Sequence, residues 1–265
     1  MGQKLSNAPV YFTIAQVRFN PILSLDSYIP AIQESFRKSG FPDYKKLVSM
    51  AFNLTQAVND EATPTQPPLQ EQVARYVFSN MKKTRGFVLQ QNSLSFQATE
   101  YDSFDQSADD LLRELGMLNQ LITLSYSERV GVRYLDAIAP RGGETLKQYL
   151  VPEVLGLYGK LNGQLAHSFS ETLTHGTAGA VMSRTIIQNG PLGLPPDLQT
   201  MGLLTLMPRF ININGEHAIL DTDGFIDVRE AFNVDNLKNR LHALHDEIIK
   251  SFRATVTDYA RSVWK

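Results

Sequence analysis

The chain has 265 residues, 43% hydrophobic and 20% charged, which is the balance of a globular protein long enough to bury a substantial core. A formal net charge of −2 gives no electrostatic reason for strong binding to nucleic acid or to a membrane surface. The absence of cysteine excludes disulfides, zinc–thiolate sites, iron–sulfur clusters and thiol nucleophiles, and no apolar run approaches the ~18 residues that span a bilayer. These features predict a cytoplasmic protein.

The N-terminal part of the chain reads as a strand followed by a helix. Residues 10–19 alternate like a strand, which ends at Asn20-Pro21 because proline cannot donate a hydrogen bond to a neighbouring strand. Asp26 is expected to cap a helix over residues 27–38. The apolar stretch 46–57 is ambiguous, and a strand is the favoured interpretation.

Residues 59–70 form the clearest loop, with three prolines among polar residues. We interpret this loop as an insertion within a hairpin, because too little chain precedes it to form a separate core. Strands are predicted over residues 72–80 and 86–101, with a basic loop between them. Residues 104–121 then form an amphipathic helix that Ser103 or Asp105 caps.

Residues 127–140 are predicted to be the central strand of the fold. Apolar and polar residues alternate along it, so that Val130 points to one face and Arg129 and Arg133 point to the other. Asp136 shares the apolar face, where a carboxylate is unfavourable unless it is paired or hydrogen-bonded.

The second half of the chain opens with a glycine pair at 142–143, a turn into a helix predicted over residues 145–158. Strands follow over 164–174, 178–188, 203–212 and 217–226, with turn signals at 176–179 and 214–215. The longest helix pattern, 234–264, closes the chain, and Thr257-Asp258 is expected to kink or recap it.

The order of these elements predicts the fold class. Strands come in runs and do not alternate strictly with helices, which argues against a doubly wound parallel fold. We predict an α+β fold with a mainly antiparallel sheet and helices packed on one face. Residues 1–140 and 141–265 look alike in outline, which leaves open two similar halves within one compact unit, although no residue-level repeat is present.

Four segments carry a family resemblance: VYFTIAQVRFNPI near the start, RVGVRYLDAI at 129–138, LDTD at 220–223, and LHALHDEIIKSFRATVT at 241–257. Together they resemble a sporadically distributed bacterial family of roughly this length that has no assigned activity. This chain has Asp136 where the family more often has asparagine. The patchy distribution of such families implies mobile loci, including those of antiviral defence.

Two clusters could supply the groups of a hydrolase. In the first, His167, Glu171 and His175 share one face of a predicted strand, but neighbours in this set stand about 13 Å apart along it. In the second, Asp221 and Asp223 lie about 7 Å apart on one strand face, as oxygen ligands for a hard cation would. His217 precedes them on the same strand. The competing interpretations are a partly exposed polar face for the first cluster and an Asp-Gly turn for the second.

Two further groups of polar residues could form a functional site or could be ordinary surface positions. His242, His245 and Asp246 lie close together on the final helix, where helix-surface positions explain them best. Arg129 and Arg133 on the open face of the central strand could form an anion-binding or RNA-binding surface with three more basic residues, Lys82, Lys83 and Arg85. Solvated arginines on an exposed sheet face are the commoner arrangement.

No nucleophile elbow, phosphate-binding loop, kinase set or cofactor motif is present. We therefore predict a non-catalytic binding or assembly protein that acts with a protein partner, has no cofactor and does not bind a membrane, and for which Arg129, Arg133 and Asp136 are candidate binding residues. One alternative is a metal-dependent or histidine-based hydrolase, such as a ribonuclease, that uses His167, His175, His217, Asp221 and Asp223. Another is a ligand cavity between a curved sheet and the final helix, identifiable as a dry pocket lined by aromatic side chains.

Overall fold

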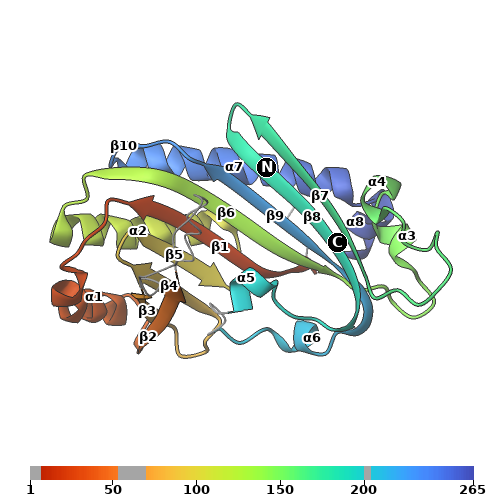
Figure 1. The fold of residues 1–265 in the computed structure, drawn as a ribbon, viewed down its shortest axis with the longest axis horizontal. Helices are drawn as coiled ribbons and strands as arrows, with labels where there is room; N and C mark the ends of the chain where they lie inside the picture. The colour runs from red at the N-terminus through yellow and green to blue at the C-terminus, as the bar shows by residue number, and fades with distance from the viewer. Residues whose placement is uncertain (1–6, 53–69, 200–203) are drawn as a thin grey trace, which may run out of the picture.

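The fold is built on one antiparallel sheet, seen across its width in Figure 1. The structure is a computed structural model and describes residues 7–52, 70–199 and 204–265. Nine strands follow the order β2-β3-β4-β5-β1-β6-β9-β8-β7, and β10 pairs with β6 beside them. The strands are β1 (Val10–Phe19), β2 (Asp43–Phe52), β3 (Gln70–Ser79), β4 (Arg85–Gln90), β5 (Ser93–Ala98), β6 (Tyr126–Ile138), β7 (His167–Gly176), β8 (Gly179–Pro191), β9 (Asn214–Ile226) and β10 (Glu230–Ala231).

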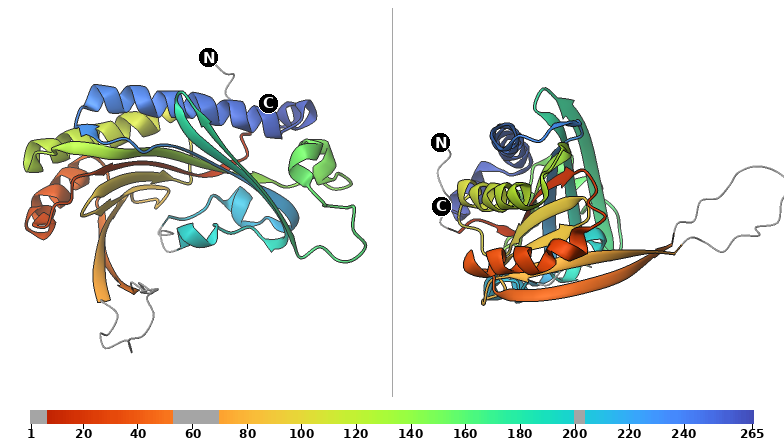
Figure 2. Two further views of the ribbon diagram at one scale, coloured as in Figure 1. Left: turned by 45° about the horizontal axis from the view of Figure 1, so that its top comes forward. Right: turned by 90° about the vertical axis from the view of Figure 1, so that its left-hand side faces the viewer.

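Three long helices cover one face of this sheet: α1 (Leu25–Lys38), α2 (Phe104–Ile122) and α7 (Val234–Thr255). Figure 2 shows α2 and α7 lying side by side above the curved sheet. The shorter helices are α3 (Leu146–Tyr149), α4 (Pro152–Leu155), α5 (Pro196–Gln199), α6 (Pro208–Ile211) and α8 (Asp258–Val263). The predicted α+β class, with a mainly antiparallel sheet, is confirmed.

The central strand β6 has the two faces that its sequence predicts. Val130 and Val132 pack into the buried cluster that α1, α2 and α7 share with the sheet. Leu135 and Ala137, of opposite parity, contribute to a second buried cluster on the other face. β6 lies between β1 and β9, paired antiparallel with both.

That second face is covered in part by the segment that carries α5 and α6. Phe210 of α6 packs near the Tyr11 ring, with 5.8 Å between ring centroids. The Tyr11 hydroxyl donates to the Gly193 carbonyl at 2.9 Å, and the Thr99 hydroxyl donates to the Thr205 carbonyl at 2.7 Å. These contacts hold the segment against the sheet, so both faces are partly covered although the long helices lie on one.

The order of elements repeats within the chain. β1 is followed by α1, by a meander of strands that returns to pair with β1, and by α2. β6 is followed by two short helices, by the meander β7-β8-β9 that returns to pair with β6, and by α7. The two meanders extend the sheet in opposite directions from the central pair β1 and β6 (Figure 1). Similarity in outline is therefore present in the topology, while one sheet runs through residues of both halves.

Two predicted elements of the first half begin or divide differently. The single strand expected over residues 86–101 is the hairpin β4-β5, which turns at Gln91-Asn92. Because the turn reverses the chain, Val88 faces away from Leu94, with which it shares sequence parity. The helix expected from residue 27 begins at Leu25 with Ser24 as its N-cap, so Asp26 lies in its first turn. The prolines of the predicted loop 59–70 fall outside the described residues, and the strands on either side of them pair as a hairpin.

Two predictions in the second half were wrong in detail, and a third was confirmed. The helix expected over residues 145–158 is broken into α3 and α4, because Pro152 holds Val151 in extended backbone at ψ 152°. The strand expected over residues 203–212 contains α6, which Pro208 begins at its first position. The expected recapping at Thr257 is confirmed: the final helix divides at Val256, and the Thr257 side chain caps α8 by accepting from the Ala260 amide at 3.2 Å.

Candidate functional site

A groove lies between the sheet and α7 where α7 continues beyond the start of α2. The two helices are antiparallel neighbours, since Asp109 of α2 pairs with Lys238 of α7 and Phe104 of α2 stacks on His245 of α7. Past Phe104 the remaining turns of α7 have no long helix beside them, as Figure 1 shows. The space left over β1 and β6 is a groove of about 1240 Å³.

Asp136 of β6 lies at the floor of this groove with only 6% of its surface exposed. Its neighbours across the sheet are Val10 on β1 and Leu220 on β9, neither of which can donate a side-chain hydrogen bond. Among the described residues, no hydrogen bond or ion pair reaches its carboxylate. Burial raises the pKa of Asp136 from 3.8 to about 7, because the charged form is poorly solvated there.

Beside Asp136 a short chain of hydrogen bonds crosses from the sheet to α7. The hydroxyls of Tyr101 and Tyr134 are 3.2 Å apart, and the Tyr134 hydroxyl is 3.2 Å from Nδ1 of His245. The His245 ring stacks on Phe104 with centroids 4.1 Å apart. Burial lowers the pKa of His245 to about 4 and raises the pKa of Tyr101 to about 12, so both groups are neutral near pH 7.

The rim of the groove carries charges of both signs. Asp102 and Asp105 lie at the α2 end, next to the residues that begin that helix. Arg253 of α7 lies at the other end, where Arg261 of α8 is paired with Asp258, and Arg209 joins the lining from the α6 segment. The groove therefore has an acidic end, an end with charges of both signs and a buried carboxylate in its floor.

The predicted metal-binding or hydrolytic residues lie elsewhere, on the face of the sheet opposite to α7. Strand register places Glu171 of β7 and Asp221 of β9 opposite the same residue, Arg184 of β8, so these side chains share that face. The same alternation along β7 and β9 puts the remaining candidates there too: His167, His175, His217 and Asp223. The side chains do share one face, but three of them already have other partners: Glu171 pairs with Arg184 at 2.7 Å, and His217 and Asp221 are also bonded.

His217 is fully buried and its ring nitrogens lie 3.1 Å from Gln188 Nε2 and 2.9 Å from the Gly215 carbonyl oxygen. Asp221 accepts two hydrogen bonds from Arg133, both 2.7 Å long, and a third from Arg184 at 3.4 Å. The residues of β7 are exposed at the edge of the sheet. Within residues 7–52, 70–199 and 204–265, no three histidine or carboxylate side chains come together closely enough to hold a metal ion.

Asp223 differs from Asp221 because no ion pair reaches it among the described residues. Burial raises its pKa, and the neighbouring guanidinium groups of Arg133 and Arg129 act in the opposite direction. The neighbouring carboxylate of Asp221 also raises the pKa of Asp223, so burial outweighs the guanidinium groups at this position.

The basic surface that sequence spacing indicated does not form. Arg129 pairs with Asp227 at 2.7 Å, and Arg133 pairs with Asp221 and with Asp197 of α5. Arg85 lies on the other face of the sheet, where it pairs with Asp110 of α2. The five basic residues were grouped by sequence alone, and strand alternation separates Arg85 from Arg129 and Arg133.

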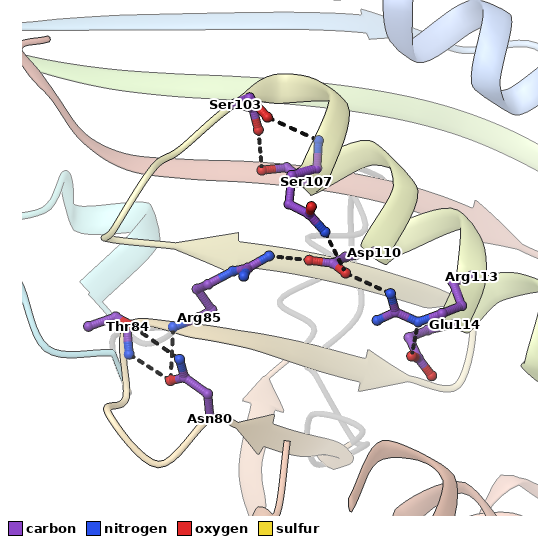
Figure 3. A network of polar contacts seen from close by, with 9 residues as sticks. Asn80, Thr84, Arg85, Ser103, Ser107, Asp110, Arg113 and Glu114 are labelled. Atoms are coloured by element: carbon purple, nitrogen blue, oxygen red, sulfur yellow. Dashed lines mark hydrogen bonds and ion pairs between the residues drawn. The ribbon is translucent and has the colours of Figure 1, made fainter. Parts of the chain in front are cut away.

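Figure 3 shows the network in which Arg85 takes part. Asp110 also accepts from Arg113 at 2.7 Å, and Arg113 donates to Glu114 at 2.9 Å. Both acids are nearly fully buried. Their sequence signal was an acidic pair four residues apart beside the leucine stripe of α2. Because every charge in the network has a partner, it anchors α2 to β4 and leaves no group free for a ligand.

Sequence reasoning identified one residue of the groove and missed others. Asp136 was singled out as a carboxylate on an apolar face. His245 was assigned to the helix surface with His242 and Asp246, and that was wrong, because it packs between Phe104 and Tyr134. The groove does occupy the place expected for a ligand cavity between the sheet and the final helix, but charged as well as aromatic groups line it.

Comparisons of the chain with protein-family models, with curated proteins and with solved structures find no match. The resemblance to a sporadically distributed bacterial family therefore stays a prediction. In the described part of the chain, no helix combines the length and the apolar character needed to cross a membrane.

Proposed function

We propose that this chain is a non-catalytic binding protein that holds a segment of a partner protein in the groove beside α7. The observation that supports this proposal is the size of the groove, about 1240 Å³, along an open surface between secondary-structure elements. Pockets for small molecules are usually about 300–1,000 Å³ and enclose most of the ligand. A larger, open site suits a stretch of polypeptide better.

The composition of the lining supports the same proposal. Apolar side chains such as Ile248 and Phe252 of α7 and Val10 of β1 form its inner part, and charged side chains form its rim. Protein–protein interfaces have this arrangement, in which an apolar centre supplies affinity and a polar rim meets solvent. Because a sheet and a long helix form the walls, the site is held in shape before a partner binds.

Two features argue against catalysis in the groove. The lowered pKa of His245 makes its neutral imidazole a weak base, and Tyr101, with a pKa raised to about 12, stays protonated near pH 7, so neither is a ready base or nucleophile there. Asp136 has a pKa near 7, but the described groups beside it supply no activated second group for acid–base chemistry. The alternative hydrolase on the opposite face has less support, because partners already occupy His217 and Asp221.

The proposal is tested by site-specific photo-crosslinking in the native host. A photo-reactive amino acid at Ile249, which lines the groove, is expected to capture one partner protein reproducibly. The same amino acid at Met81, which is 84% exposed and distant from the groove lining, serves as the matched control. If the chain belongs to a mobile or antiviral-defence locus, as the family resemblance implies, we expect the partner to be encoded in the same locus.

Capture of the same protein from both positions, or from neither, would refute the assignment of the groove. A crosslinked band that appears from Ile249 and disappears when the bulky Ser262→Trp substitution narrows the groove would support it. The Ser262→Trp chain must keep the wild-type unfolding midpoint for this comparison to count.

A further inference from the structure

The unpartnered carboxylate of Asp136 indicates which chemical group the groove receives. Asp136 lies on the face of β6 that faces α7. It lines the groove, although only 6% of its surface is exposed. The side chains next to it on β1 and β9 are aliphatic. The site is therefore a negative group in an apolar floor, reachable from the groove and unmatched by any described residue.

A buried charge without a partner is unfavourable, and the protein retains this one at the floor of a groove of about 1240 Å³. Burial alone accounts for the raised pKa of Asp136, since no neighbouring charge is among its causes. A cation from a ligand would offset the lost solvation, because an ion pair is stronger where water is excluded. A neutral hydrogen-bond donor would replace part of the lost solvation without balancing the charge, and an anionic group would destabilise the carboxylate further.

The surrounding side chains suit a cation as well. The rings of Tyr101 and Tyr134 meet edge to face with centroids 5.5 Å apart, and both tyrosines line the groove. Aromatic faces attract ammonium and guanidinium groups, and the two hydroxyl oxygens can accept hydrogen bonds from them. His245 is neutral near pH 7 because its pKa is lowered to about 4, so it does not compete as a cation.

The rim adds a second requirement. Arg253 at the α8 end repels a uniformly basic segment, while Asp102 and Asp105 at the α2 end attract one. A segment with one cationic side chain for the floor and a carboxylate toward Arg253 would match the charges of the floor and of the α8 end.

We propose that Asp136 is the binding site for the cationic side chain, lysine or arginine, of the partner segment that occupies the groove. This inference rests on the proposed function and specifies the chemistry of the segment. Tyr101 and Tyr134 are positioning residues that flank the cation.

The experiment uses the full chain and three small probes: the N-acetyl N-methylamide derivatives of lysine, arginine and norleucine. Each is titrated into the isotopically labelled protein, and the dissociation constant is obtained from backbone amide shifts. The norleucine compound has nearly the same aliphatic stem as lysine without the charge, and the arginine compound separates guanidinium from ammonium recognition. We expect one cationic probe to bind at least about tenfold more tightly than the norleucine probe.

The variants are Asp136→Asn and Asp136→Leu, both expected to lose that preference. Asp223→Asn is the matched control, because Asp223 is another buried carboxylate without an ion pair among the described residues, on the adjacent strand and the opposite face. It should keep the wild-type preference. If one Asp136 variant does not fold, the other carries the test, and the comparison of probes on the wild-type chain needs no variant.

Equal binding of the cationic and norleucine probes to the wild-type chain would overturn this inference, as would a preference that survives in the Asp136 variants. Either outcome leaves the proposed function standing when the crosslink from Ile249 still forms. Loss of that crosslink with an intact cation preference would instead refute the proposed function and keep the charge selectivity of Asp136.

Discussion

Two aspartates on adjacent strands, Asp136 of β6 and Asp221 of β9, are nearly fully buried on opposite faces of the sheet. They are one residue apart in register, because Asp136 lies opposite Leu220 and Leu135 lies opposite Asp221. Asp221 has three hydrogen bonds from two arginines, whereas no described residue pairs with Asp136. At similar burial, Asp221 is held by ion pairs on one face, whereas Asp136 on the other face has no described partner.

The face explains the difference. Strands β6 and β8 bring Arg133 and Arg184 to either side of Asp221, and α5 adds Asp197 to the same network. On the opposite face the positions next to Asp136 are aliphatic, and α7 crosses above them without a cation in reach. A buried carboxylate alone does not mark a site; a buried carboxylate that lines a groove without a partner does.

The largest expected effect comes from breaking the paired side of this comparison. Asp221→Ala leaves two partly buried guanidinium groups without their central acceptor, which should lower the free energy of unfolding by about 3–5 kcal/mol. Urea denaturation at pH 7 measures the loss. A change below about 1 kcal/mol would mean that the network adds little stability and that its arrangement does not distinguish the two faces.

The unpaired side should behave in the opposite way. The pKa of Asp136 is raised in the fold, so the folded state holds more protons than the unfolded state between about pH 4 and pH 7, and stability falls as pH rises through that range. Asp136→Asn removes the charge and should stabilise the protein by roughly 2–4 kcal/mol at pH 8. At pH 4, where the carboxyl group is protonated, the two proteins should unfold at similar urea concentrations.

The pH dependence of that difference is the decisive measurement. A stabilisation that is equal at pH 4 and pH 8 would show that packing, and not the charge of Asp136, produces it.

A smaller effect on the free energy of unfolding is expected from His245, whose protonation at acid pH destabilises the fold. Its lowered pKa means that the unfolded state binds a proton more readily, so stability is intact above about pH 6.5 and declines as pH falls toward 4. His245→Gln should remove about 1–2 kcal/mol of the loss between pH 7 and pH 5, after allowance for the partial exposure of the ring. His242→Gln, one turn away and more exposed, should decline with pH as the wild type does.

The smallest effect is expected from a third aspartate of the same sheet. Asp227 pairs with Arg129 at 2.7 Å, but its side chain is 53% exposed. Exposed ion pairs contribute little, so Asp227→Ala should change the free energy of unfolding by less than about 1 kcal/mol. Thermal melts of this variant beside Asp221→Ala compare two arginine–aspartate pairs that differ mainly in burial.

Much of the fold was predictable because it depends on local patterns. Alternation along residues 127–140 gave the strand, its two faces and the unusual placement of Asp136. Local patterns failed at Gln91-Asn92, where the turn between β4 and β5 does not interrupt the alternation of a single strand. They also failed at Pro208, where proline begins a short helix within an apolar run that was predicted to be a strand.

The site was predictable only in part, because it depends on distances between elements. The pairing of Arg133 with Asp221 joins residues 88 positions apart and requires β6 and β9 to be neighbours. The groove exists because α7 extends past the first residue of its antiparallel neighbour α2. The sequence of neither helix shows how far one extends past the other. His245 belongs to the groove only because Phe104 lies against it.

A backbone hydrogen bond between the two ends of the fold bears on how the chain could be reconnected. The Asn7 amide donates to the Trp264 carbonyl at 3.0 Å, so the start of β1 and the end of α8 meet at one corner of the molecule. A short linker joining these points, with a new opening cut in the Arg141–Glu144 turn, would reorder the sequence while preserving every strand pairing. Such a circular permutant separates β6 from the meander β7-β8-β9 in synthesis, and its refolding rate would report whether β6 must precede that meander for the sheet to assemble.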